Sequence, residues 1–424
     1  MQAFLTDYCI NSRNRTVSLG YLNGLEALIE RAGPTSSVAE ACRTIGLAHL
    51  GQKLSNPVFM QKANKMYFEL LPSFRLTISN KATSTTVHSL MTAVLLGLYE
   101  IITSTGTKPG AHIAHARGVS AILTSKSSPF NLLCEGKLFQ LASPLPLDQL
   151  ETLESKNATT SSLQRSERFS ILCTPTDNTS WPTLDAIFVK MHPLVRRAEV
   201  ALADKSTLLE DLQRFKQEAE QIRKDYSTWT MNIPKEWQPT VVGIIPNTHF
   251  ATRLEPGYWP GPVMKYYDLY VSSIMNSYRK ARLLLLDVIV NCDKAISRLQ
   301  KNVIADPTIF AEIQELTFDI TASIPYHLAD NLQEFDQSLS SDGTMKAIVP
   351  GRSVGGLLLM HTLYMVATLS IADPALKEYF RDCLAWIGKN MGIGQATMLS
   401  ETTHLDLQGF ITEAHVLIWA GMLA

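Results

Sequence analysis

Three segments of the chain carry side chains that can donate a proton or a hydrogen bond in a reaction. These residues are Tyr267, Tyr270, Arg279 and Arg282 in the first segment, Tyr326 and His327 in the second, and His361 and Tyr364 in the third. An unperturbed histidine titrates near pH 6.5, so it can give and regain a proton near neutrality. Buried tyrosine and arginine side chains can donate hydrogen bonds to an oxygen on which negative charge develops. These residue types therefore point to general-acid chemistry and to the orientation of a carbonyl oxygen.

Each of these side chains also has a purely structural interpretation. A tyrosine can be an amphipathic core residue whose hydroxyl finds its partner inside the fold. Arg279 and Arg282 can pair with acidic residues such as Asp319, and His361 can be a hydrogen-bonded core histidine. At the level of sequence both interpretations stay open.

The signatures of the common enzyme classes are absent from the 424 residues. No glycine-rich phosphate loop precedes a helix, and no Gly-x-Ser-x-Gly turn occurs. His112 and His115 could place two imidazoles on one helix face, but no acidic or thiol companion lies nearby, which favours a polar helix edge over a metal site. None of the six cysteines lies within 30 residues of the next, so a short metal-binding spacing is excluded. We expect buried free thiols, no metal and no cofactor.

Helices must position these residues, because the apolar periodicity is helical nearly everywhere. One stripe runs from Leu208 to Trp229 with spacings of 4, 3, 4, 3, 4 and 3 residues, and we expect that helix to begin upstream, near Pro193. A second helix is expected from about Met264 to Cys292, and it is apolar on most faces. Such a helix is buried on most sides, which makes it the candidate for the central helix. Shorter helices are expected at roughly 18–32, 36–51, 55–73, 84–104, 110–124, 309–328, 355–370, 373–391 and 406–422.

Two stretches read as irregular. Residues 152–166 are rich in Ser, Thr and Asn, which predicts an exposed loop. Residues 230–262 hold six prolines together with Trp237 and Trp259, so they form either a lid over a pocket or an ordered crossover. Within them, Val241 to Ile245 is a short apolar run with no evident strand partner.

Composition and charge narrow the class of protein. Hydrophobic residues make up 46% of the chain, enough for a large buried core, and we expect one all-α domain spanning residues 1–424. Lys plus Arg is 38 and Asp plus Glu is 39, so the net charge is 38 − 39 = −1, which gives no electrostatic footprint for nucleic acid or an anionic membrane. The N-terminus does not resemble a signal peptide, and the most apolar stretch, Ser89 to Thr103, is too short to span a bilayer. We expect a cytoplasmic protein.

Five segments between His115 and Ala396 carry a resemblance to a known family, in that family's order. They are His115-Ala-Arg117-Gly118-Val-Ser-Ala-Ile-Leu, Tyr278-Arg279-Lys280-Ala281-Arg282-Leu-Leu-Leu, Asp319-Ile-Thr-Ala-Ser323-Ile-Pro325-Tyr326-His327-Leu, Gly355-Gly356-Leu-Leu-Leu with Leu363-Tyr364-Met-Val-Ala, and Met391-Gly392-Ile-Gly394-Gln395-Ala396. Together they resemble the helical regulatory domain of fungal-specific transcription factors. The resemblance implies an all-α fold, and a nuclear location if the chain is a regulator.

The chain departs from that family at two points. The family's regulators carry a zinc cluster of six closely spaced cysteines and a basic linker, and neither occurs in the 424 residues. This puts sequence-specific DNA binding by the usual route in doubt. The family's Trp-Pro pair is replaced by His361-Thr362, which puts a titratable group where a packing group is expected.

A regulator fold without its DNA-binding head can serve as an accessory regulator, a small-molecule sensor or an enzyme. In overall layout the chain resembles the transcription-factor-like hetero-Diels–Alderases of tropolonic sesquiterpenoid pathways. That resemblance implies dehydration to an o-quinone methide, followed by addition to a terpene alkene, without a cofactor. Catalysis would then use His327, His361 and Arg279, with hydrophobic substrates bound by Tyr267, Tyr270, Arg282, Tyr326, Tyr364 and Trp259.

A pocket is required under either reading. We expect a largely apolar cavity beside the helix from Met264 to Cys292, covered in part by residues 230–262. Pro325 should deform its helix and turn Tyr326 and His327 off the regular path. The expected partners are hydrophobic small molecules, with no specific nucleic acid and no membrane. The sequence leaves a homodimer open.

Overall fold

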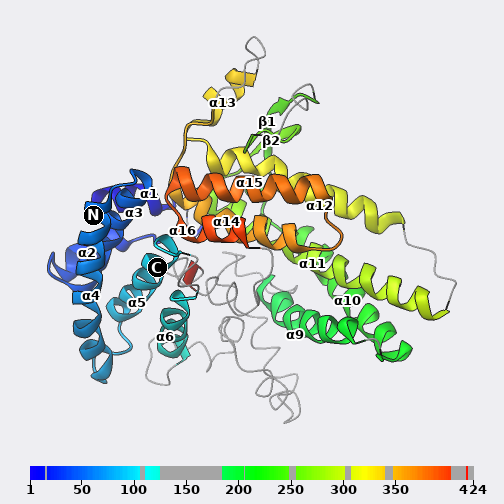
Figure 1. Cartoon of the computed structure of the whole chain (residues 1–424), viewed down its shortest axis with the longest axis horizontal. Coiled ribbons are helices and arrows are strands. Elements are labelled where there is room, and N and C mark those ends of the chain that lie inside the picture. Colours follow the sequence, from blue (N-terminus) through cyan, green and yellow to red (C-terminus); the bar gives the residue numbers. More distant parts are fainter. Residues whose placement is uncertain are drawn as a thin grey trace.

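The computed structural model describes residues 1–14, 17–105, 110–124, 184–204, 206–247, 255–300, 307–339, 347–402 and 417–418. Within these residues the chain forms fourteen α-helices, one 3-10 turn and a single two-stranded sheet (Figure 1). The expected all-α fold is confirmed. The expected loop at 152–166 and the last expected helix, apart from Leu417 and Ile418, lie outside the described residues.

The helices are α1 (Gln2–Tyr8), α2 (Leu25–Ala32), α3 (Ser37–Lys53), α4 (Pro57–Ser79), α5 (Val87–Ile102), α6 (His112–Thr124), α9 (Leu184–Ala203), α10 (Leu209–Thr230), α11 (Leu269–Gln300), α12 (Pro307–Leu328), α13 (Leu332–Leu339), α14 (Ser353–Thr368), α15 (Pro374–Met391) and α16 (Gly394–Glu401). The 3-10 turn is η2 (Lys235–Trp237), and the strands are β1 (Thr240–Ile245) and β2 (Gly261–Lys265). In Figure 1, α1 to α6 lie on one side of the molecule and α9 to α11 on the other, with α14 and α16 between them.

Helix starts follow local sequence signals. The Asn56 side chain accepts a hydrogen bond from Val58 N at 3.0 Å, and Pro57 occupies the first turn of α4. Asp373 caps α15 in the same way, ahead of Pro374. A side-chain cap satisfies a backbone donor that the first helical turn leaves without a partner, and proline suits a position where no donor is needed.

The expected central helix is α11. It packs against α9, α10, α12 and α14. Most of its side chains are buried, including Tyr270, Ile274, Leu285 and Ile289. It begins at Leu269 rather than at Met264 because residues 261–265 form strand β2.

The helix expected to start near Pro193 is two helices. Pro193 lies inside α9, and α10 begins separately at Leu209. Between them the Asp204 carboxylate accepts hydrogen bonds from the Ser206 backbone N–H at 2.8 Å and from its hydroxyl at 2.7 Å. A local side-chain turn of this kind competes with continuation of a helix.

The apolar run from Val241 to Ile245, for which the sequence shows no strand partner, lies in a strand that is paired. β1 pairs antiparallel with β2, with Val241 opposite Met264 and Ile245 opposite Gly261. β2 packs on α12 and α13 packs on β1, so the described part of residues 230–262 is an ordered arm (Figure 1). No described helix is long and apolar enough to cross a membrane.

Candidate functional site

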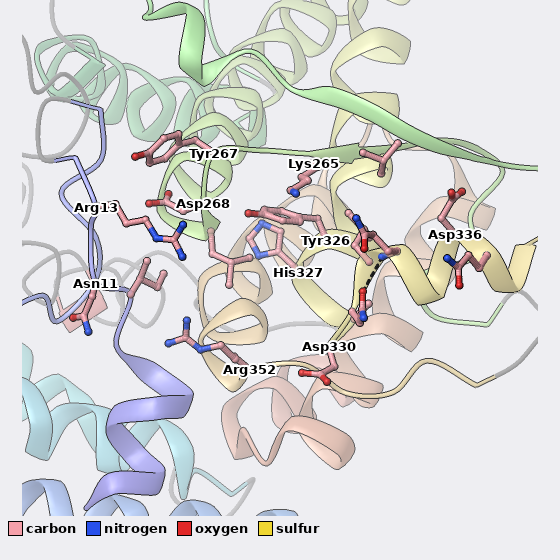
Figure 2. A pocket seen from close by; sticks show the side chains of 18 residues that line it. Asn11, Arg13, Lys265, Tyr267, Asp268, Tyr326, His327, Asp330, Asp336 and Arg352 are labelled. Atoms are coloured by element: carbon pink, nitrogen blue, oxygen red, sulfur yellow. Dashed lines mark hydrogen bonds between the residues drawn. The ribbon is translucent and has the colours of Figure 1, made fainter.

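A cleft of about 1210 Å³ opens where the N-terminal segment, the hairpin and the ends of three helices meet (Figure 2). Its lining comes from the segment after α1 (Ile10, Asn11, Arg13), the hairpin (Val242, Lys265), the turn into α11 (Tyr267, Asp268, Leu269), the end of α12 (Tyr326, His327), the turn into α13 and α13 itself (Ala329 to Gln333, Asp336, Gln337), and Arg352 before α14. The cleft touches only the first residue of the central helix, and much of its lining is charged. The expected cavity was largely apolar, and in this respect the structure differs.

The N-terminal wall of the cleft is held by reciprocal capping. The Asp7 carboxylate accepts hydrogen bonds from Ser353 N at 3.0 Å and Ser353 Oγ at 2.9 Å, at the start of α14. It also lies 2.6 Å from His49 Nε2. Arg352 donates through Nε to the Thr6 carbonyl at 2.8 Å, at the end of α1. A carboxylate at a helix start and a guanidinium at a helix end both suit the helix dipoles, so α1 and α14 fix each other.

His327 reaches the cleft from the last turn of α12. Its Nδ1 lies 3.0 Å from the Gly355 carbonyl and its Nε2 lies 2.8 Å from the Ser272 hydroxyl. Since a carbonyl only accepts, Nδ1 carries the proton and Nε2 accepts from Ser272. Burial lowers the pKa of His327 to about 4. The imidazole is therefore neutral near pH 7 and both its nitrogens have partners, an arrangement that holds α12 against α11 and α14.

Two tyrosines flank this histidine. The Tyr326 hydroxyl donates to the Tyr266 carbonyl at 3.2 Å, and burial raises the pKa of Tyr326. Tyr267 is 40% exposed and makes no hydrogen bond with another described residue. Together the two rings give the cleft an aromatic surface with polar edges.

Asp268 is the acidic group nearest to these tyrosines (Figure 2). Its Oδ1 accepts from Val271 N at 2.9 Å, which makes it the N-terminal cap of α11. Burial raises the pKa of the Asp268 carboxyl above its usual value, although hydrogen bonds from Ser18, Val271 and Tyr270 act in the opposite direction. A carboxyl with a raised pKa beside a cleft is a candidate proton donor.

The two arginines nominated on the central helix lie away from the cleft. Arg279 is 2% exposed, pairs with Asp319 at 3.1 Å and donates to Asn276 Oδ1 at 3.0 Å. Arg282 pairs with Glu312 and donates to the Tyr278 hydroxyl. Both tie α11 to α12, which is the ion-pairing interpretation that the sequence left open.

His361 lies in a separate buried cluster. Its Nε2 lies 3.2 Å from Gln395 Oε1. Burial, together with the charge of Lys280, lowers the pKa of His361 to about 3, and burial alone lowers the pKa of Lys280 to about 7. The cluster joins α11, α14 and α16 inside the core, so the structure does not bring His361 together with His327.

The other nominated residues are also dispersed. Tyr270 is fully buried on α11, and the Tyr364 hydroxyl is buried on α14 without a hydrogen-bond partner among the described residues. Trp259 packs against Tyr379, with ring centroids 5.0 Å apart. Of the nine nominated residues, only Tyr267, Tyr326 and His327 line the cleft.

Of the histidine pair of α6, His115 makes a contact to another helix, α4. His115 Nε2 lies 2.8 Å from the Tyr67 hydroxyl. The described residues contain no group of three or more His, Cys, Asp or Glu side chains arranged to hold a metal. The described cysteines Cys9, Cys42, Cys292 and Cys383 are free and buried, as expected.

Sequence reasoning missed all six charged residues of the cleft, namely Arg13, Lys265, Asp268, Asp330, Asp336 and Arg352. Except for Asp336, which lies within α13, they lie before helix starts, in the hairpin or in the N-terminal segment, where no apolar periodicity marks a position. One usable signal was Asp268 itself, because an aspartate directly before a long apolar stripe is an N-cap pattern.

Comparison with known proteins finds a relative that matches this chain over its full length. The chain is 36% identical over 431 residues to the protein named transcription factor dbaG of Emericella nidulans, and the match covers 100% of this chain and 95% of that protein. No family model matches the chain. No solved structure matches it either.

Proposed function

This chain belongs to the same family as the fungal transcription factor dbaG, and from that premise we propose that it is a ligand-binding protein of fungal specialised metabolism. The observation that carries the proposal is the cleft, where two tyrosines, a neutral histidine and charged side chains from five parts of the chain converge. Concave sites with a few convergent polar groups are where small molecules bind. In this role the chain is a regulator of biosynthesis, and the bound ligand is the signal to which it responds.

The full-length relation supports a regulatory role. It extends over the helical chain as a whole and leaves only 5% of the relative outside the match (100 − 95). The net charge of −1 and the absence of a cysteine cluster in these 424 residues argue that regulation works through ligand or protein contacts rather than through zinc-cluster DNA binding.

Thermal unfolding with and without aromatic metabolites tests the ligand-binding role. A ligand that binds only the folded state raises the melting temperature. Asn11→Trp puts bulk into the cleft wall and should abolish the rise, whereas Gln61→Trp, on the exposed face of α4, should leave it intact. A rise that survives Asn11→Trp would place the ligand elsewhere.

A second candidate function is the cofactor-independent hetero-Diels–Alder cyclisation. The volume of the cleft favours it, because 1210 Å³ exceeds the roughly 300–1,000 Å³ of sites for one drug-sized ligand. Two partners held in a reactive orientation gain much of the rate from proximity alone. In this role Asp268 gives a proton to the leaving benzylic hydroxyl, which departs as water. It then takes the phenolic proton, so that the quinone methide forms and the carboxyl is restored.

Product analysis separates the two functions. The purified chain is incubated with a hydroxylated quinone methide precursor and a terpene alkene, and the adduct is resolved by chiral chromatography. One enantiomer in excess would support the cyclase. A racemic adduct formed at the rate seen in buffer, alongside measurable ligand binding, would leave the regulatory role.

A further inference from the structure

The cations of the cleft differ in whether they have partners. The side chains of Arg13 and Lys265 make no ion pair or hydrogen bond with any other described residue. Both are exposed, and in Figure 2 Arg13 lies beside Asp268, on the same side as Tyr267, while Lys265 lies beside Tyr326. Two cations thus flank the aromatic surface of the cleft.

Arg352 adds a third cation that is held in place. Its Nε and Nη2 donate to the main-chain carbonyls of Thr6 and Cys9. Carbonyls orient a guanidinium but do not cancel its charge, and the nearby Asp7 carboxylate is engaged by His49 and Ser353. Figure 2 shows Arg352 on the same side of the cleft as Arg13.

Three carboxylates also line the cleft: in Figure 2 Asp268 lies beside Arg13, Asp330 lies to the right of Arg352, and Asp336 lies farthest from Arg13. Asp268 caps α11 through Val271 N. Asp336 is pressed against strand β1, because a Cβ at Gly243 would come within 2.0 Å of its Oδ1. Arg13 and Lys265 are the cations best placed to hold an anion, because neither side chain forms an ion pair or hydrogen bond with a described residue.

We propose that the cleft selects an anionic aromatic small molecule, whose ring lies against Tyr267 and Tyr326 and whose acidic group is held by Arg13 and Lys265. This rests on the proposed function, since it names the chemical class of the ligand for the same cleft. Charge-assisted hydrogen bonds from arginine and lysine to a carboxylate are about twice as strong as neutral ones. Tyrosine rings supply the apolar contact for the rest of the ligand.

A matched pair of probes tests the class of ligand. Naphthalene-2-carboxylate and the neutral naphthalene-2-carboxamide have the same ring, and calorimetry on the full chain gives both dissociation constants. We expect the carboxylate to bind about 10-fold more tightly, which one charge-assisted contact can provide. The preference should shrink in about 0.5 M salt, because exposed charges are screened.

Variants test whether Arg13 and Lys265 cause the preference for the carboxylate probe. Arg13→Gln and Lys265→Gln should each reduce it several-fold, and the double variant should bring the two probes to about equal affinity. Lys62→Gln, an exposed lysine on α4, is the matched control and should change nothing. A preference that persists in the double variant would overturn the assignment of these two residues.

The remaining outcomes distinguish the two proposals. Equal affinity of the two probes for the wild-type chain, with binding lost in Asn11→Trp, would refute the anionic class and leave the ligand-binding cleft standing. Failure of both probes to bind the wild-type chain would count against the cleft as a site for aromatic ligands, and so against both proposals.

Discussion

Two titratable residues of the cleft respond to burial in opposite senses. Burial keeps His327 neutral, with a pKa of about 4, while burial raises the pKa of the Asp268 carboxyl. A group that must donate a proton near neutral pH needs a pKa closer to that pH than a free carboxyl has. Because both nitrogens of His327 already have hydrogen-bond partners, Asp268 is the proton donor used in the cyclase proposal and His327 is a structural link.

Asp268→Asn tests the proton donor. Asparagine caps a helix about as well as aspartate, so the melting temperature should change little. If the chain is a cyclase, turnover of a hydroxylated precursor should fall by about 10²–10⁴-fold, while addition of a preformed quinone methide should be largely unaffected. Rates on both substrates would be compared in one preparation. An equal loss of rate on the two substrates would show that Asp268 only caps α11.

His327→Gln tests the structural link through pH. The folded-state pKa of His327 lies below the unfolded value near 6.5, so the unfolded chain binds the extra proton first as pH falls. The wild-type chain should therefore lose stability between about pH 6.5 and pH 4, and a glutamine would remove this share of the loss. Urea unfolding gives the free energy of unfolding of both proteins, and the difference between the two values should become smaller as pH falls through that window.

The control for that titration is His88→Gln, an exposed histidine at the start of α5. It should follow the wild-type curve at every pH. A constant gap between wild type and His327→Gln across the whole window would contradict the neutral, buried assignment.

At single positions, the sequence did not show which side chains share a site. Tyr326 and His327, which are adjacent in the chain, both line the cleft. Arg279 was found to pair with Asp319, one of the two alternatives. Arg13 and Lys265 could not be predicted as neighbours, since only the tertiary fold brings the N-terminal segment to the hairpin.

Among the elements, the meeting of α12 and α14 positions His327. The Gly355 backbone lies so close to α12 that a Cβ there would come within 2.1 Å of the His327 carbonyl oxygen. The Gly355 carbonyl also accepts the His327 Nδ1–H. Glycine is required at this contact because backbone meets backbone, which no rotamer change can relieve.

Gly355→Ala should therefore separate the two helices and destabilise the fold by about 1–3 kcal/mol, the usual cost of overpacking. Gly118→Ala is a matched control, since it lies within α6 and its Cβ would meet nothing within 4 Å. That control should gain up to about 1 kcal/mol from helix propensity. Equal effects of the two substitutions in urea unfolding would show that the α12–α14 contact can relax at no cost.

Helices could be predicted where a periodic apolar stripe extends over many residues. The hairpin of β1 and β2 could not be predicted. The stripe of α10 predicted its buried face, including Phe215 and Trp229. The pairing of β1 with β2 was missed because two short strands with prolines around them carry little periodicity, and both strands pack against helices, β2 on α12 and β1 on α13. That hairpin is one wall of the cleft, so missing it also hid Lys265.

At the scale of the whole molecule, the similarity to a named transcription factor and the balance of charges lead to different expectations about DNA binding. The chain shares its family with a protein named as a transcription factor. Its 38 basic and 39 acidic residues give no net attraction for a polyanion. Family membership thus predicts a regulatory context, while charge predicts that this chain is a poor DNA ligand on its own.

Binding to DNA should accordingly be weak and indifferent to sequence. Affinity for a duplex comes largely from neutralised phosphates and the counterions they release, and this chain offers neither a zinc cluster nor a basic linker in its 424 residues. A gel-shift assay at physiological salt, with promoter DNA of a biosynthetic cluster and a scrambled duplex of equal length, should show little and equal retardation. A tight shift on the promoter alone would contradict the prediction. It would mean that a protein with a net charge of −1 concentrates basic side chains on one face, and it would favour the regulator over the cyclase.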